Sequence, residues 1–497
     1  MKKILCFVLV LMLVVASVVT LAACDNTKTL LIWGPGDHED VYLEWVQKFM
    51  DQYPEQFEGY KVQFAGSGDV GAYAAMNVDP STGAAVYTFS NDQMANLVNL
   101  ASLSPVIGDN LTWSEEHNSQ AAFDATFIGD KSYAYPCQAD NGYYMYYNKS
   151  AFRGTAVWDS TNDTLKEGYT FRDLYAALDE KGGDWANGQV TWALGDSWYV
   201  SGVFFAVGGD YEVKYDEAGK QSSADCWFGF TLPEGVTDNK KGDYTVGMDA
   251  YECLKNTITV SNTDNTVNSH YLYSDCDKNP LNDNIDIYTN PDNAQGKDTP
   301  LAAAVCGTWK AKKLQEAWGD DYGATVLPTL ETNDGELFAM KNFAGYKHIG
   351  VNPQNEFAKQ SRENLELLHK LAQYLSDKEA SLARYEATGA GPSNLEALKD
   401  PKIAADSALI ALNAQYDRVC KYPDNYSKAD LRGQVIGNGL GYRIQDSVPA
   451  NYWTPIQKFG NNLYTEFSSD KLENFASRGK IMDYLAALQT EISQAAQ

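Results

Sequence analysis

Positive charge is scarce in this sequence, which has 39 lysine and arginine residues against 66 aspartate and glutamate residues and a formal net charge of −27. That balance repels nucleic acid and anionic lipid surfaces, so we expect no nucleic acid among its partners. Histidine is rare as well, and no Cys-x-x-Cys pair or His/Cys cluster occurs. A zinc site is therefore not expected, and no motif indicates a cofactor.

Long apolar runs are absent beyond the N-terminus. Lys2 and Lys3 precede an apolar run over residues 4–19, and Leu21-Ala22-Ala23-Cys24 follows it. This order is typical of an export signal, and a retained transmembrane anchor is the alternative, for which the run is short. The tetrapeptide resembles the lipobox of bacterial lipoproteins, which implies cleavage before Cys24, lipidation of its thiol and stable anchoring at the outer side of the cytoplasmic membrane. We expect a signal peptide over residues 1–23 and a tether over residues 24–29.

Cysteine is infrequent, whereas aromatic residues are abundant. Of the eight cysteines, Cys6 would leave with the signal and Cys24 would carry lipid. The other six allow 15 disulfide pairings, and a chain of this size can fold without any. The 32 tyrosines and 11 tryptophans, with 19 phenylalanines, bring the aromatic share to 12%. Their rings offer flat apolar faces with polar edges, which suit a carbohydrate ligand.

Strands and helices alternate from residue 30 onward. A buried strand over residues 30–33 ends at Gly34-Pro35-Gly36, and Asp37 is placed to cap the helix that follows. Strands are also predicted over residues 61–65 and 84–89, the latter running into a Ser-x-x-Gln capping box at residues 90–93. Helices are expected to begin with caps at residues 170–173 and 376–379, and Gly389 is expected to end the second of these helices. Alternation predicts an α/β sheet, whose ligands lie beyond the carboxyl ends of the strands. Asp37 and Asp92 both follow such ends.

The stretch from Tyr133 to Lys149 contains two aromatic strand halves that meet at a polar turn, Asp140-Asn141-Gly142. A chain of this length is expected to form more than one core. We interpret the stretch as a crossing between two lobes that is both hinge and binding wall. Because side chains alternate along a strand, at most one of Tyr143 and Tyr144 faces the cleft.

Seven segments carry a resemblance to a known family: IWGPGDHEDVYLEWVQKF, AAVYTFSNDQMANLV, AYP with YYNKS, YGATVLPTL, LSDKEASLARYEATGAG, LKDPKIAADSALIALNAQ and VPANYWTPI. Together they resemble the maltose- and maltodextrin-binding proteins of ABC transporters, in order and over nearly the whole mature chain. The resemblance implies a two-lobed, periplasmic-binding-protein-like α/β fold with hinge crossings and a ligand cleft between the lobes.

By this resemblance the first lobe comprises residues 30–140 and 344–391, and the second comprises residues 141–343 and 392–497. Crossings are expected near Asp140, Phe343 and Gly391. Residues 212–300 depart from the family pattern and suggest an elaborated surface region. Within it, four residues have the spacing of a calcium loop, although Pro280 replaces the glycine and the final glutamate is missing, so a solvated loop is the alternative. These four are Asp275, Asp277, Asn279 and Asp286.

The resemblance also implies which residues contact ligand. Sugar hydroxyls need carboxylate and amide partners, and sugar faces stack on aromatic rings. Polar contacts are expected from Asp37, His38, Asp92, Gln93, Asp140, Asn141 and Asp196. Aromatic contacts are expected from Phe89, Tyr143, Tyr144, Trp198, Tyr199, Trp309, Tyr452 and Trp453. Gln93 stands where the family leads us to expect arginine; helix capping by Asp92 and Gln93, and core packing by each tryptophan, are the structural alternatives.

We therefore expect a monomeric, lipid-anchored extracellular protein that binds a maltooligosaccharide or related α-glucan by lobe closure. The implied partners are the permease subunits of an ABC importer and the membrane, through lipid on Cys24. A lipid-anchored glycoside hydrolase is the alternative, since it would also use carboxylates and aromatic rings. The sequence has neither Gly-x-Ser-x-Gly nor His-Glu-x-x-His.

Overall fold

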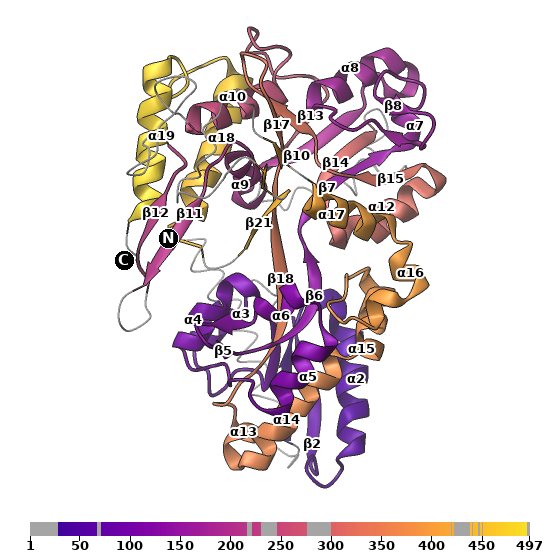
Figure 1. Cartoon of the computed structure of the whole chain (residues 1–497), viewed down its shortest axis with the longest axis vertical. Helices are drawn as coiled ribbons and strands as arrows, with labels where there is room; N and C mark the ends of the chain where they lie inside the picture. The colour runs from indigo at the N-terminus through magenta and orange to yellow at the C-terminus, as the bar shows by residue number, and fades with distance from the viewer. Residues whose placement is uncertain are drawn as a thin grey trace.

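The computed structural model describes residues 28–66, 71–215, 221–229, 246–275 and 300–418, and the shorter segments 420–421, 438–439, 441–445, 448–449 and 451–494. Figure 1 shows two lobes joined by long strands, with the first part of the chain in the lower lobe. The predicted signal peptide, Cys24 and the calcium-loop positions Asp277, Asn279 and Asp286 lie outside the described residues. Among the described residues, no helix has both the length and the apolar character needed to cross a membrane.

The lower lobe is built on β2, β1, β3, β6 and most of β18, in a sheet with the order β2-β1-β3-β18-β21 in which β6 also pairs with β18. The last strand, β21, pairs with the start of β18 and contacts α9 of the upper lobe. β1 is parallel to β2 and β3, whereas β18 is antiparallel to β3 and β6. Helix α14 packs against α2, β18 and β6, so the apolar faces of these elements share one core. Their bounds are β1 Lys28–Trp33, α2 Glu39–Gln52, β2 Tyr60–Ala65, β3 Val86–Ser90, β6 Tyr135–Asn141, β18 Asn342–Val351, α14 Arg362–Ser376 and β21 Tyr442–Ile444.

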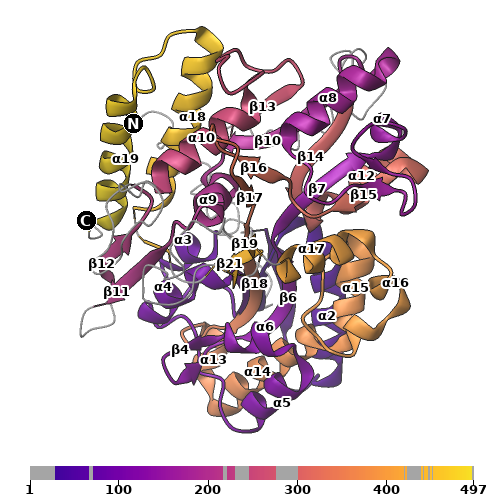
Figure 2. The same ribbon diagram turned by 45° about the horizontal axis from the view of Figure 1, so that its top comes forward.

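The upper lobe is built on a second sheet with the order β13-β10-β14-β7-β15. Its three middle strands, β10, β14 and β7, are buried on both faces, and Trp192 belongs to the large core rich in aromatic side chains that surrounds them. Helices α8, α9, α10, α18 and α19 lie in the same lobe, as both views show (Figures 1 and 2). The bounds are β7 Tyr143–Asn148, α8 Phe171–Lys181, β10 Gln189–Gly195, α9 Ser197–Ala206, α10 Val246–Ile258, β13 Tyr271–Asp275, β14 Leu301–Gly307, β15 Tyr322–Thr325, α18 Trp453–Ser469 and α19 Arg478–Ser493.

Shorter elements complete the described chain. α17 lies beside β7 and β15, α16 follows next to α17, and the hairpin β11-β12 lies beside α19 on the other side of the molecule (Figure 1). The bounds are η1 Gly36–His38, α3 Ala72–Met76, η2 Asn91–Gln93, α4 Met94–Asn99, α5 Asp109–His117, α6 Gln120–Asp124, β4 Phe127–Ile128, β5 Lys131–Ser132, α7 Lys149–Phe152, β8 Trp158–Asp159, β9 Thr164–Leu165, η3 Gly183–Trp185, β11 Tyr211–Tyr215, β12 Gln221–Cys226, η5 Thr308–Lys310, α12 Ala311–Trp318, η6 Gly319–Asp321, β16 Thr329–Glu331, β17 Leu337–Ala339, α13 Glu356–Gln360, α15 Lys378–Thr388, η7 Ala397–Lys399, α16 Pro401–Ala404, α17 Ser407–Asp417, β19 Cys420–Lys421 and β20 Asn438–Gly439.

The chain passes from one sheet to the other at Gly142. β6 continues through Asn141 in the first sheet and β7 begins at Tyr143 in the second, so the link is shorter than the polar turn predicted from the sequence. A Cβ at Gly142 would lie 2.5 Å from the Tyr416 hydroxyl and 2.8 Å from Leu412 Cδ1, distances that real Cβ atoms do not adopt. A larger residue here would therefore have to displace the ends of the Tyr416 and Leu412 side chains of α17.

Local capping predictions had mixed outcomes. The box formed by Thr170 and Asp173 at the start of α8 is confirmed, as is the left-handed Gly389 that ends α15. The box at Ser90 is wrong, because Ser90 makes no capping bond and Gln93 Oε1 accepts from the Tyr73 backbone N–H instead. Two further cap predictions are also wrong. Asp37 lies exposed within η1 and makes no capping hydrogen bond. The cap of α15 is Asp377, one residue after the predicted Ser376.

Candidate functional site

Asp140 joins three separate parts of the chain at the crossing between the sheets. Its carboxylate Oδ2 accepts a hydrogen bond of 2.6 Å from the Gly391 backbone N–H and one of 2.9 Å from the Thr308 hydroxyl. Only 4% of the residue is exposed. The ionised acceptor makes both bonds strong, so Asp140 fixes the end of β6 against the loop after α15 and the turn after β14.

Gln445, which follows β21, occupies the centre of the junction and was not predicted. Its side-chain Oε1 accepts hydrogen bonds from Trp198 Nε1 at 3.0 Å and from Asn141 Nδ2 at 3.1 Å. Its backbone N–H donates to Ala344 O at 2.8 Å, and its carbonyl accepts from Asn91 Nδ2. Because Asn91 belongs to the first sheet's lobe and Trp198 to the second, Gln445 contacts both lobes.

Asp92 lies in η2, beside this junction. Its Oδ1 is buried and has no hydrogen-bond partner among the described residues. Burial raises the pKa of the carboxyl group to about 6, although hydrogen bonds from its own backbone and from the Gln445 side chain act in the opposite direction. A carboxyl group that is held here with an unused acceptor is suited to take a hydroxyl donor from a ligand.

Two tryptophans form the aromatic part of the junction. The rings of Trp198 and Trp309 lie 5.7 Å apart at 41°. Trp309 is 41% exposed, which is unusual for so large an apolar side chain, and its ring covers Gly307, where any Cβ would collide with it. Trp198 is half-buried and packs edge-on against Tyr143 at 4.7 Å. An exposed ring held on a rigid turn is a suitable platform for a sugar face.

Asp196 positions Trp198 through the backbone. It is the N-cap of α9, and its side chain accepts a hydrogen bond of 2.8 Å from the Trp198 N–H. Burial raises the pKa of the Asp196 carboxyl group, and the same hydrogen bond opposes that rise. The residue therefore has a structural task at the site.

Five of the predicted contact residues lie in the core, behind the junction. β7 is a central strand buried on both faces, so neither Tyr143 nor Tyr144 has an exposed face. The Tyr143 hydroxyl donates to the Tyr199 carbonyl at 3.2 Å, and the Tyr452 hydroxyl donates to Ser201 Oγ at 2.9 Å. The members of this buried group are Phe89, Tyr143, Tyr144, Tyr199 and Tyr452. They pack behind the residues of the junction, and direct contact between them and a ligand stays a prediction.

The remaining predicted residues lie at varying distances from the junction. Asp37 is exposed at the start of the first lobe, whereas His38 is buried and its Nε2 lies 3.1 Å from the Thr388 hydroxyl. Trp453 is half-buried against Phe343, with 6.0 Å between the rings. Gln93 is held by the Tyr73 backbone. Their roles also stay predictions.

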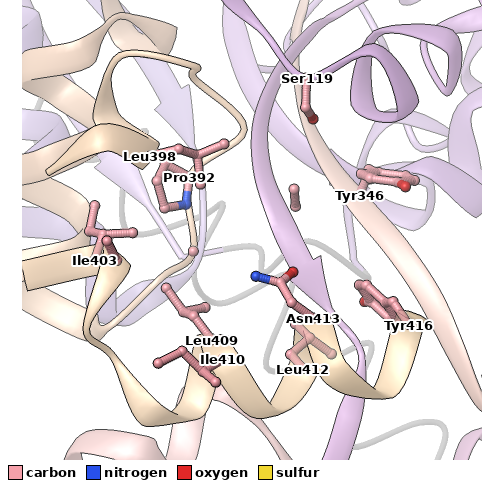
Figure 3. A pocket seen from close by; sticks show the side chains of 13 residues that line it. Ser119, Tyr346, Pro392, Leu398, Ile403, Leu409, Ile410, Leu412, Asn413 and Tyr416 are labelled. Carbon is pink, nitrogen blue, oxygen red and sulfur yellow. The ribbon is translucent and has the colours of Figure 1, made fainter. Parts of the chain in front are cut away.

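A pocket of about 290 Å³ lies close to the junction but contains none of the predicted contact residues (Figure 3). It is mainly apolar, and Ala139 and Gly391 place it next to Asp140. In Figure 3 the side chains of α17 line one side, and Tyr346 lies opposite. Among the described residues, no group of three or more His, Cys, Asp or Glu could hold a metal ion.

Comparison with known proteins identifies the family. The sequence model of the family described as "Bacterial extracellular solute-binding protein" matches residues 46–411, well over half of the chain. The chain belongs to this family of solute-binding proteins. The predicted two-lobed α/β fold is confirmed by solved structures that cover 94% of this solute-binding protein.

Individual relatives are distant. A galactooligosaccharide-binding protein of Bacillus subtilis (strain 168) is 33% identical over 114 residues, and the match spans 24% of that relative and 23% of this chain. A structure described as "with acarbose" has a TM-score of 0.65 at 19% identity, with 99% of it covered. The maltodextrin-binding protein MalE1 of L. casei BL23 without ligand has a TM-score of 0.61 at 18% identity, with all of it covered.

Proposed function

We propose that this solute-binding protein captures an oligosaccharide between its lobes and delivers it to an ABC importer. The observation that carries the proposal is the exposed Trp309 ring beside Trp198, with hydrogen-bonding groups of both lobes next to the two rings. Sugars need this pairing, because each pyranose presents an apolar face and a rim of hydroxyls. Family membership supports the same function.

Within this proposal, Trp309 and Trp198 stack on sugar rings, and Asp92 and Asn141 bind hydroxyls. Asp37, like Asp92, contributes from the first lobe, opposite the two tryptophans. The other predicted contact residues, which are buried or partly buried, act from behind the surface formed by the two tryptophans or at its margins. They are His38, Phe89, Gln93, Asp140, Tyr143, Tyr144, Asp196, Tyr199, Tyr452 and Trp453.

The ligand we propose is a maltooligosaccharide or a related α-glucan. Structural relatives described with acarbose and as maltodextrin-binding support this class, and a relative named for galactooligosaccharide supplies the competing class. Calorimetry with maltose, maltotriose, maltohexaose and a galactooligosaccharide mixture tests the choice. If only the galactooligosaccharide binds tightly, it replaces the α-glucan as the proposed ligand. If none of the four sugars gives a heat of binding, the proposal is contradicted.

Capture by closure requires two bodies that move. We propose that residues 30–140 with 344–391, and residues 141–343 with 392–497, rotate about crossings near Asp140, Phe343 and Gly391. Ligand that touches both lobes favours the closed form, which the permease would recognise. Small-angle X-ray scattering should show a smaller radius of gyration with maltohexaose than without. An unchanged radius at saturation would contradict closure.

The chain is also proposed to be anchored by lipid on Cys24 and to act without chemistry. Cys24→Ser should move the protein from the membrane fraction to the medium, whereas the matched change Cys6→Ser, within the signal, should not. Incubation with maltohexaose separates binding from hydrolysis. Release of shorter sugars would favour the glycoside hydrolase, and intact sugar with a change in tryptophan fluorescence would favour the binding protein.

A further inference from the structure

The carboxamide of Gln445 lies among the groups that we propose for sugar hydroxyls. Its Oε1 accepts from Trp198 Nε1 at 3.0 Å and from Asn141 Nδ2 at 3.1 Å. Its side chain also hydrogen-bonds the Asp92 carboxyl group. Two donors thus converge on one oxygen, and an adjacent donor meets a carboxylate. A sugar hydroxyl, with one O–H and two lone pairs, would satisfy the same three partners.

The backbone holds Gln445 in this position from both sides. Residues Tyr442–Ile444 of β21 pair in parallel with Asn342–Ala344 of β18, and the Gln445 N–H extends this ladder to Ala344 O at 2.8 Å. One residue earlier along the strand than Ile444, Arg443 donates from Nε to Asp210 Oδ1 at 2.8 Å, with its guanidinium 3.8 Å from the centre of the Tyr211 ring. Gln445 itself is only 6% exposed, so neighbouring residues surround its side chain on nearly all sides.

We propose that Gln445 is an internal substitute for a ligand hydroxyl, an autoinhibitory contact that competes with the oligosaccharide. This inference rests on the proposed function. In the ligand-free protein the carboxamide is hydrogen-bonded to Trp198, Asn141 and Asp92, so a sugar must displace it before the sugar can take over these bonds. Affinity is set by the difference between the two sets of hydrogen bonds, and the protein binds more weakly than its aromatic platform alone would allow.

Calorimetry with maltohexaose on the full-length protein tests this. Gln445→Ala removes the competitor and should lower the Kd by 3- to 10-fold. Gln445→Asn, which withdraws the carboxamide by one methylene, should act in the same direction and guards against misfolding of the first variant. The control Ile444→Ala changes an exposed neighbour on the same strand and should leave the Kd unaltered.

The outcomes separate the inference from the proposed function. If the wild type binds and Gln445→Ala binds equally or less tightly, the inference is wrong and the function stands. If neither binds maltohexaose or any other glycan of the panel, both fail. As a second readout, the Gln445 side-chain amide protons should exchange with water faster in the saturated protein than in the free one; slower or equal exchange would mean that Gln445 stays in place, which overturns displacement.

Discussion

Replacing Asp140 by alanine should destabilise the protein far more than an ordinary surface change. The side chain is 4% exposed, and its Oδ2 accepts from the Gly391 N–H and the Thr308 hydroxyl. Hydrogen bonds to a charged group contribute about 1.5–3 kcal/mol each, and the substitution also leaves the Gly391 N–H buried without an acceptor. We expect Asp140→Ala to lower the free energy of unfolding by about 3–6 kcal/mol.

The individual bonds can be separated by matched variants. Thr308→Val removes only the hydroxyl donor and should lower the free energy of unfolding by about 1.5–3 kcal/mol. Asp140→Asn keeps an acceptor of similar shape without the charge, so its effect should lie between those of the wild type and alanine. In the double variant Asp140→Ala, Thr308→Val, the two effects should not add, because they remove the same bond.

Urea unfolding followed by circular dichroism measures these differences, with Asp37→Ala as a control at an exposed carboxylate. The free energy of unfolding of the Asp37→Ala control should stay within about 0.5 kcal/mol of the wild-type value. A loss of less than about 1 kcal/mol in Asp140→Ala, below the range for one charged hydrogen bond, would refute the assignment of Asp140 as the clamp of the crossing.

Three further predictions concern the tryptophan platform and two buried ionisable groups. Trp309→Ala and Trp198→Ala should each weaken oligosaccharide binding by more than tenfold, about 1.4 kcal/mol, by calorimetry, and unaltered affinity in both would remove the proposed platform. Because the pKa of Asp92 is raised to about 6, the folded state binds this proton more tightly than the unfolded state does, so stability contributed by Asp92 is present at low pH and is lost as pH rises from about 4 to 6. Asp92→Asn should flatten that part of the urea-unfolding profile and stabilise the protein above pH 6 by about 2–3 kcal/mol; a profile identical to that of the wild type would contradict the assignment. His348 is fully buried, and burial lowers its pKa to about 3, although a hydrogen bond with the Ala125 backbone acts in the opposite direction. Below about pH 6.5 the unfolded chain therefore binds a proton at His348 that the folded chain does not bind, so the free energy of unfolding falls on acidification. His348→Phe should lessen this fall between pH 6 and pH 4, and thermal unfolding measures it.

The sequence was informative where the relevant contacts are local. The Thr170 capping box joins residues three positions apart, and the left-handed Gly389 needs only its own conformational freedom, so both could be read from the residues themselves. Alternating strands and helices likewise predicted an α/β sheet, and the resemblance to a known family implied its division into two lobes. The stretch that contains Gly142 was recognised as a link between strands because its polarity changes abruptly.

Prediction failed where distant contacts decide. Gln93 satisfies the backbone of Tyr73, 20 positions away, and this tertiary bond replaced the local capping box. Gln445 bonds Trp198 at a separation of 247 positions and follows a segment with no recognisable motif, so no local signal identified it. The surroundings of β7 could not be read locally either, because the second sheet places strands on both of its edges and core side chains on both of its faces. Which aromatic rings stay exposed is a property of the whole packed lobe.

The single-residue link at Gly142 constrains the kind of motion available to the molecule. Asn342, where the neighbouring strand β18 begins, donates from Nδ2 to the Tyr143 carbonyl at 2.7 Å, so the two chain passages are tied side by side. If the lobes close as proposed, these two adjacent passages must bend together, so they favour a rotation of one lobe against the other over a sliding motion. The size of the ligand would then determine the angle between the closed lobes, and a permease could recognise that angle without contacting the sugar.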